Sequence, residues 1–220
     1  MTGHLGGPRP AAADPAPPRL PAHRPASASA APGASYSVLF VCTGNLYRSP
    51  LAERLLVARL GPDTPVRVAS AGTQAVRTDH MDRETRSVLT ELGGDGEDFR
   101  PQPLTARLVA EADLVLGMEH RHREAAVRLA PTAMRRCFTL KEFIRLSEGD
   151  HVGTEPGRDL AAHAAGRRGS VIAPLPVEDG IADPMGAPHE VLRRCAGDID
   201  ALVARLAALL TAALGPAART

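Results

Sequence analysis

The chain has 220 residues and a formal net charge of +1, with 44% hydrophobic and 3% aromatic residues. This length can bury the core of one α/β domain of ordinary size. A net charge so close to zero creates no field that would select nucleic acid or an anionic membrane, so we expect neither as a partner.

The first 36 residues are rich in Ala and Pro and contain no continuous hydrophobic segment. They cannot bury enough apolar surface to offset the entropy of the chain, so residues 1–36 are predicted to be a disordered tail without a secretory signal. No apolar run approaches the roughly 18 residues that span a bilayer. Three widely spaced cysteines fit a reducing compartment, and together these features predict a cytoplasmic protein.

Strands and helices alternate along the first half of the chain. The continuous apolar run Val38–Val41 is typical of a parallel strand that is buried on both faces. A loop is expected over residues 42–47, followed by a helix that starts at Ser49 and Pro50 and stops at the Gly-Pro pair of residues 61–62. The pattern then repeats, with a predicted strand over residues 66–69 and a helix over residues 82–92.

The second half continues this alternation with one interruption. The expected elements are a short helix over 104–111, a strand over 114–116, a helix over 120–129, a strand over 137–140 and a helical stretch to residue 146. Residues 147–176, rich in Gly, Pro, Ala and Arg, are expected to form a long loop or an insertion. Apolar residues at helical spacing predict a final helix over 191–210. The alternation indicates an α/β domain over residues 37–214, with a parallel sheet covered by helices on both faces.

Cysteine and histidine side chains outside the first loop have structural interpretations. Cys137 falls in a predicted buried strand and Cys195 in the apolar stripe of the last helix, so both are interpreted as small core residues. His120 and His122 are interpreted as solvated helix positions rather than zinc ligands, and no metal site is predicted.

One loop carries the strongest chemical signal. Between the first strand and the first helix stand Cys42, Thr43, Gly44, Asn45, Leu46, Tyr47, Arg48 and Ser49. Backbone N–H groups of such a tight loop converge on one point, and the helix that follows adds the positive end of its dipole. The sequence therefore predicts an anion site in this loop.

Each side chain of this loop has a chemical use there. The positive field favours the thiolate form of Cys42, which is the nucleophilic form. The planar guanidinium of Arg48 can hold two phosphoryl oxygens, which a lysine could not do. Gly44 lets the backbone approach an anion closely, and Ser49 can donate its hydroxyl to the thiolate. We therefore expect Cys42 to attack phosphorus while Arg48 holds the phosphoryl oxygens.

Several segments of the sequence resemble the low-molecular-weight protein-tyrosine phosphatase family, in its bacterial type. The resemblance covers Val38–Glu53, Ser70–Thr73 and Ala112–Glu119, and it ends at Asp183 and Pro184 ahead of the last helix. It implies a doubly wound sheet of four parallel strands, with the phosphate-binding loop after the first strand. It implies no cofactor.

The resemblance also implies a two-step mechanism. Cys42 would form a phosphocysteine intermediate while Arg48 stabilises the equatorial oxygens. Asp183 would protonate the leaving oxygen and then activate water, although Asp183 before Pro184 is by itself equally typical of a turn. Asn45 and Ser70 would brace the loop by hydrogen bonds. The substrate would be a phosphorylated protein or a small phosphomonoester bound by the loop.

Several positions depart from the family pattern. Tyr47 stands where many members carry a second cysteine, so we expect peroxide to drive Cys42 further up the oxidation ladder. Met185 and Gly186 stand where an aromatic residue is usual, which leaves specificity for phosphotyrosine open. Tyr47 could line the cleft in place of that aromatic residue, or it could pack under the sheet. Leu46 stands where a sequence that resembles the arginine-phosphatase branch would carry threonine. This leucine counts against phosphoarginine as the substrate.

Two functions compete with a monomeric protein-tyrosine phosphatase. A phosphate-binding regulatory module without turnover would keep the anion site, but retention of Cys42, Arg48 and Asp183 argues against it. Arsenate reduction, which a related branch performs, resembles a relay through two further cysteines. Cys137 and Cys195 are interpreted as core residues and do not offer that relay.

Overall fold

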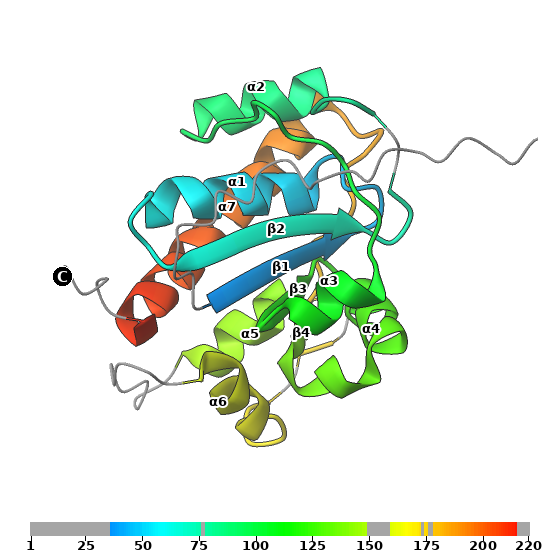
Figure 1. Cartoon of the computed structure of the whole chain (residues 1–220). Helices are drawn as coiled ribbons and strands as arrows, with labels where there is room; N and C mark the ends of the chain where they lie inside the picture. Colours follow the sequence, from blue (N-terminus) through cyan, green and yellow to red (C-terminus); the bar gives the residue numbers. More distant parts are fainter. Residues whose placement is uncertain (1–35, 76–77, 149–158, 173, 176–177, 215–220) are drawn as a thin grey trace, which may run out of the picture.

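The computed structural model describes residues 36–75, 78–148, 159–172, 174–175 and 178–214. Within them, four parallel strands form a sheet in the order β2-β1-β3-β4, with helices on both faces (Figure 1). The strands are β1 (Tyr36–Cys42), β2 (Val66–Gly72), β3 (Leu114–Gly117) and β4 (Cys137–Thr139). The predicted doubly wound α/β fold is confirmed.

The helices build a separate core on each face of the sheet. The larger core contains side chains of α1 (Arg48–Leu60), α2 (Arg83–Glu91), α5 (Leu140–Ser147), α6 (Leu160–Gly166) and α7 (His189–Leu214). The smaller core contains side chains of α3 (Ala106–Glu111), α4 (His120–Leu129) and the short 3-10 helix η1 (Pro131–Arg136). No helix in the described ranges is both long enough and apolar enough to cross a membrane.

The side-chain alternation of β1 determines on which face the loop begins. Val38, Phe40 and Cys42 belong to the larger core, whereas Leu39 and Val41 belong to the smaller one, and each is at most 2% exposed. This alternation follows from the pleat of a strand, in which successive side chains point to opposite faces. Cys42 therefore leaves the sheet on the side of α1 and α7.

Strand register brings several segments to one edge of the sheet. Cys42 at the end of β1 is paired with Gly72 at the end of β2, and Val41 is paired with Gly117 at the end of β3. In open parallel sheets, ligands bind at this carboxyl edge. A side chain at Gly72 could not be accommodated, because a Cβ there would lie 2.7 Å from the carbonyl oxygen of Thr43.

Two predicted segments differ most from the structure. Tyr36, assigned to the disordered tail, is the first residue of β1 and pairs with Val66; the other tail residues, 1–35, lie outside the described residues. The segment 147–176, expected to be a loop, contains the helix α6. That helix begins because the Asp159 side chain accepts from the backbone N–H of Ala162 at 3.0 Å, an N-cap bond. Residues 149–158 of the segment lie outside the described residues.

Candidate active site

The loop between β1 and α1 surrounds the Cys42 sulfur with donors. Cys42 ends β1 and Arg48 begins α1, so residues 43–47 make the whole connection. The backbone N–H of Asn45 donates to Cys42 Sγ at 3.3 Å, and Ser49 Oγ lies 2.9 Å from the same sulfur. The φ of Asn45 is 54°, in the left-handed region that asparagine tolerates better than most residues. The loop thus directs a backbone N–H and a hydroxyl at one buried sulfur.

A chain of hydrogen bonds continues from Ser49 to a buried carboxylate. Asn45 Oδ1 accepts from the backbone N–H of Gln102 at 2.9 Å, which fixes the orientation of the amide. Asn45 Nδ2 then donates to Ser49 Oγ at 3.0 Å and to Ser70 Oγ at 2.8 Å. Ser70 Oγ donates onward to Glu53 Oε2 at 2.6 Å. Because Asn45 gives a proton to each serine, the serine protons are free to point outward, one to the sulfur and one to the carboxylate.

Three acceptors surround the Arg48 guanidinium, whose side chain is only 2% exposed. Nη1 donates to the Glu119 carboxylate and to the carbonyl oxygen of Ile181, the latter at 2.9 Å. Nη2 donates to Asp183 Oδ2 at 2.5 Å. Two carboxylates therefore hold the fork that the sequence assigns to phosphoryl oxygens, and a bound phosphoryl group would compete with them for the same donors.

Asp183 lies on residues 180–184, which we call the strap. The backbone N–H of Ile181 donates to the carbonyl oxygen of Met118, just beyond β3, at 2.7 Å. The carbonyl oxygen of Ile181 accepts from Arg48, so the strap is held on both sides of one residue. The Asp183 side chain is 35% exposed. The strap therefore brings the third predicted catalytic residue to the edge of the sheet where the loop lies.

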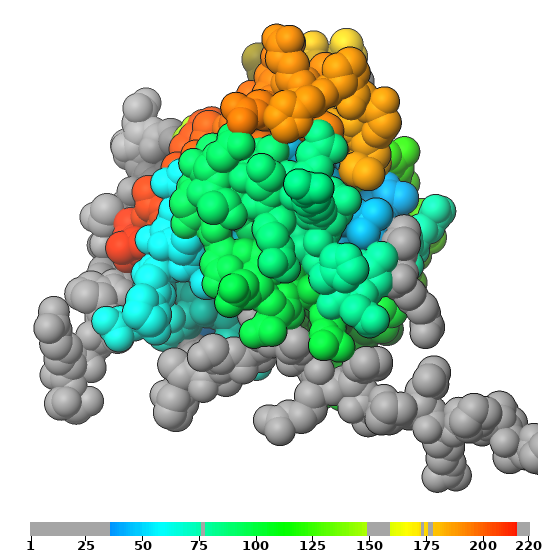
Figure 2. Space-filling model, turned by 90° about the horizontal axis from the view of Figure 1, so that it is seen from above, coloured from blue at the N-terminus to red at the C-terminus, as the bar shows by residue number. Residues whose placement is uncertain are grey.

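The rim of the loop consists of Thr43, Gly44 and Leu46, which are partly exposed. The backbone carbonyl of Leu46 accepts from the Thr85 hydroxyl of α2 at 3.1 Å, which ties the rim to that helix. Seen from above, blue atoms from the start of the described chain reach the surface beside the orange atoms that lead into α7 (Figure 2). The rim is thus accessible next to the segment that precedes α7.

Tyr47 packs beneath the loop and does not line a cleft. Its side chain is 2% exposed, and its hydroxyl donates to the carbonyl oxygen of Leu192 in α7 at 2.6 Å. Burial raises the pKa of Tyr47 above its ordinary value. Met185, beside the strap, is 53% exposed. Of the two places predicted for Tyr47, the structure therefore has the buried one. The side chain that follows the strap, Met185, is aliphatic.

Glu119 and His122 belong to the site although neither was predicted to contribute to it. The Glu119 side chain accepts from both Arg48 and Arg121. Burial opposes its ionisation, but the hydrogen bond and the charge of Arg48 lower the pKa of Glu119 below its ordinary value. His122 is 1% exposed, so its interpretation as a solvated position is wrong. The signal available in the sequence was the position of Glu119 shortly after a buried strand, with Met118 between them.

Glu53 is a third contributor that sequence reasoning did not single out. It lies on α1 and is 6% exposed, with Ser70 as its hydrogen-bond donor. Burial raises the pKa of Glu53 from 4.5 to about 7, and the bond from Ser70 only partly opposes this shift. The Nε atom of Arg54 lies 3.7 Å from its other carboxylate oxygen. A carboxyl group that titrates near neutral pH is thus connected to the Cys42 sulfur.

The other two cysteines are core residues, as predicted, and are free thiols. Cys137 belongs to the smaller core and Cys195 to the larger core, so the sheet separates them. Burial raises the pKa of Cys195 to about 11. Among the residues that the structure describes, no three His, Cys, Asp or Glu side chains are grouped so that they could hold a metal ion.

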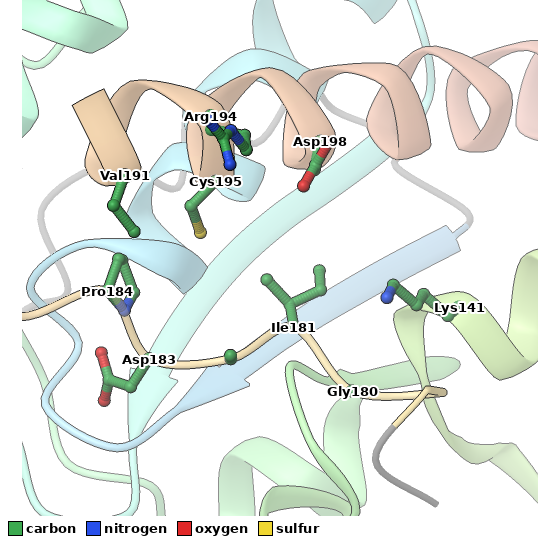
Figure 3. Close-up of a pocket in the computed structure, with 10 residues that line it drawn as sticks. Lys141, Gly180, Ile181, Asp183, Pro184, Val191, Arg194, Cys195 and Asp198 are labelled. Carbon is green, nitrogen blue, oxygen red and sulfur yellow. The ribbon is translucent and has the colours of Figure 1, made fainter. Parts of the chain in front are cut away.

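A pocket of about 300 Å³ lies between the strap and α7. Figure 3 shows Ile181 and Pro184 pointing toward α7, whereas the carboxylate of Asp183 points away from that helix. Cys195 and Lys141 also line the pocket, but no residue of the loop does. The pocket therefore lies on the α7 side of the strap, and the strap separates it from the loop and Arg48.

The model of one protein family, described as Low molecular weight phosphotyrosine protein phosphatase, matches residues 37–158. The chain belongs to this family. The matched residues of this phosphatase begin with β1 and include the loop, Glu53, Ser70 and α4. As a member of the family, it is a cysteine-dependent phosphatase.

Curated relatives of this phosphatase include enzymes named for two different substrates. A protein-arginine-phosphatase of Geobacillus stearothermophilus is 32% identical over 172 residues, which cover 78% of this chain and 94% of the relative. A probable low molecular weight protein-tyrosine-phosphatase, AmsI of Erwinia amylovora, is 36% identical over 112 residues, which cover 51% of this chain and 76% of the relative. Among solved structures, the low molecular weight protein tyrosine phosphatase from T. tengcongensis is similar with a TM-score of 0.58 and 32% identity, covering 78% of this chain and 97% of that one.

Proposed function

We propose that this phosphatase hydrolyses phosphotyrosine in proteins through a phosphocysteine on Cys42. Cys42 Sγ attacks phosphorus, forming an S–P bond while the P–O bond to the substrate breaks, and protonated Asp183 gives its proton to the leaving oxygen. Water then attacks phosphorus and yields a proton to the Asp183 carboxylate. The S–P bond breaks, which releases phosphate and restores the thiolate.

One observation carries this proposal. The hydrogen-bond donors of the loop surround Cys42 Sγ, and at the same edge of the sheet the buried Arg48 is hydrogen-bonded to Asp183. The nucleophile needs donors that stabilise its anionic form, and the phosphoryl group needs a planar cation. When a phosphoryl dianion enters the loop, Arg48 exchanges Asp183 for phosphoryl oxygens. The exchange releases the Asp183 carboxyl group for proton transfer at the moment when substrate is bound.

Phosphotyrosine is the substrate that Leu46 favours. An apolar side chain at the rim can pack against a phenyl ring, whereas it offers no hydrogen bond to a guanidinium group. Phosphoarginine is the second candidate, supported by the arginine-phosphatase relative that matches most of this chain and by Met185 at the place of an aromatic residue. We further propose that the protein acts as a monomer in the cytoplasm.

The first test measures hydrolysis of p-nitrophenyl phosphate in the presence of a metal chelator, with Cys42→Ser as the control. The wild type should turn over, and the variant should bind vanadate without turnover because the loop N–H groups and Arg48 remain. Peptides that carry phosphotyrosine, phosphoserine or phosphoarginine, compared at one concentration, then identify the substrate. Vanadate binding without turnover by the wild type would instead indicate a regulatory module, and thioredoxin-dependent arsenate consumption would indicate a reductase.

A further inference from the structure

His122 can adopt only one neutral tautomer where it lies. Its Nδ1 atom is 3.0 Å from the backbone N of Glu119, which is a donor. Nδ1 must therefore be the acceptor, and the ring proton must be on Nε2. A doubly protonated ring would place two donors against each other at Nδ1. Burial and the charge of Arg48 lower the pKa of His122 to about 4, so the ring stays neutral near pH 7.

This tautomer determines how the hydroxyl of Thr43 is used. Nε2 of His122 lies 2.9 Å from Thr43 Oγ1. Because Nε2 carries the proton, the imidazole is the donor and the hydroxyl is the acceptor. The hydroxyl proton of Thr43 is therefore not used in this bond. Within the described residues, the hydrogen bond with His122 is the one that the Thr43 hydroxyl makes to protein.

Thr43 is well placed to offer the proton to a bound molecule. It follows Cys42 directly and is partly exposed, whereas Cys42 and Asn45 are buried. The His122 ring beneath it accepts from the backbone N–H of Glu119, whose carboxylate accepts from Arg48. The pair of Thr43 and His122 therefore lies at the rim of the loop, one hydrogen-bonded residue away from Arg48.

We propose that His122 is a positioning residue that presents the Thr43 hydroxyl as a hydrogen-bond donor to the substrate. This inference rests on the phosphatase function proposed above. Loop N–H groups and Arg48 take the phosphoryl oxygens, so the acceptor for Thr43 is an oxygen beside the phosphoryl group, such as a main-chain carbonyl of a phosphopeptide. A small aryl phosphate has no such carbonyl, and Thr43 thus distinguishes peptides from small esters.

The test compares kcat and KM for a phosphotyrosine peptide and for p-nitrophenyl phosphate. Thr43→Val, which keeps the shape without the hydroxyl, should lower kcat/KM for the peptide about 3- to 10-fold, the effect of one neutral hydrogen bond, mainly through KM. Turnover of p-nitrophenyl phosphate should fall by a clearly smaller factor, because that substrate lacks the acceptor. Thr43→Ser, which retains the hydroxyl, should keep the wild-type ratio between the two substrates.

A second variant separates positioning from structure. In His122→Asn, the shorter amide can still accept from the backbone N–H of Glu119 but does not reach Thr43. It should show the same peptide-specific loss, and the double variant with Thr43→Val should lose no more than either single variant. Thermal melts establish that each variant is folded at the assay temperature.

Three results would overturn the inference. Equal losses of kcat/KM on both substrates would show that the pair only supports the loop. Unchanged peptide kinetics in Thr43→Val would show that the hydroxyl does not contact substrate. Additive losses in the double variant would show that the two residues act independently. The proposed function survives each of these as long as the wild type hydrolyses both substrates. A wild type that hydrolyses neither would overturn the proposed function and this inference with it.

Discussion

Replacement of Glu53 by glutamine should change how stability depends on pH. The fold raises the pKa of this carboxyl group from 4.5 to about 7, so the folded state binds more protons than the unfolded state between these values. The contribution of Glu53 to stability is therefore present below pH 4.5 and is lost as the pH rises through 7. At about 1.4 kcal/mol per pH unit, this loss is about 3 kcal/mol.

His122 has the opposite dependence, because the fold lowers its pKa from 6.5 to about 4. Its contribution is present above pH 6.5 and is lost as the pH falls through 4. The two groups therefore offset each other between pH 4.5 and 6.5 in the wild type. In Glu53→Gln this offset is absent, so the His122 dependence alone should raise the free energy of unfolding by about 3 kcal/mol from pH 4 to pH 6.5.

Urea denaturation at intervals between pH 4 and pH 8 measures this difference. The amide oxygen of glutamine can still accept from Ser70, so Glu53→Gln should keep its turnover. Glu53→Leu removes the acceptor and should lower turnover about tenfold, because the chain from Ser70 through Asn45 to Ser49 loses its buried end. Parallel stability curves for the wild type and Glu53→Gln would refute the reasoning, since they would mean that the carboxyl group titrates alike in both states.

Three further predictions concern the catalytic residues. Asp183→Ala should lower turnover by about 10²-fold or more for alkyl or unactivated aryl phosphate esters, and much less for p-nitrophenyl phosphate. Equal losses across a series of leaving groups would exclude Asp183 as the acid. Asp183→Asn should bind vanadate about threefold more tightly, because the anion no longer has to replace a partly exposed ion pair between Asp183 and Arg48. Weaker binding in a vanadate titration would contradict the proposal that Arg48 exchanges Asp183 for phosphoryl oxygens. After sustained peroxide treatment, dithiothreitol should not restore full activity, because Tyr47 replaces the second cysteine of the loop and Cys137 lies across the sheet from Cys42. Complete recovery would show that another thiol, such as Cys195 in the larger core, protects the nucleophile.

The sequence predicted the sheet and the loop because both depend on local signals. The apolar run before Cys42 and the proline of the first helical turn specify a buried strand and a helix start within a few residues. The resemblance implied that Asn45 and Ser70 brace the loop by hydrogen bonds, and Asn45 donates to Ser70 and also to Ser49. These features needed no knowledge of which strands are neighbours.

The contributions of Glu119 and His122 could not be derived in that way. Their partners on the loop are 71 and 79 residues away in the sequence, and they meet only because β3 lies next to β1. The run of His and Arg at the start of α4 has the composition of a solvated helix, whereas His122 is turned inward by its bonds to Glu119 and Thr43. The helix α6 was missed because its Ala-rich sequence has a weak hydrophobic pattern.

The anchoring of the strap has a consequence for how this scaffold can change. The position of Asp183 depends on the main chain of Ile181, which contacts Met118 with its N–H and Arg48 with its carbonyl. Main-chain hydrogen bonds of the strap therefore hold Asp183, the proposed acid, beside Arg48. Substitutions at the exposed Met185 can reshape the surroundings of the site while the proposed proton donor stays in place, so the range of accepted phosphoesters can diverge among descendants without loss of the chemistry.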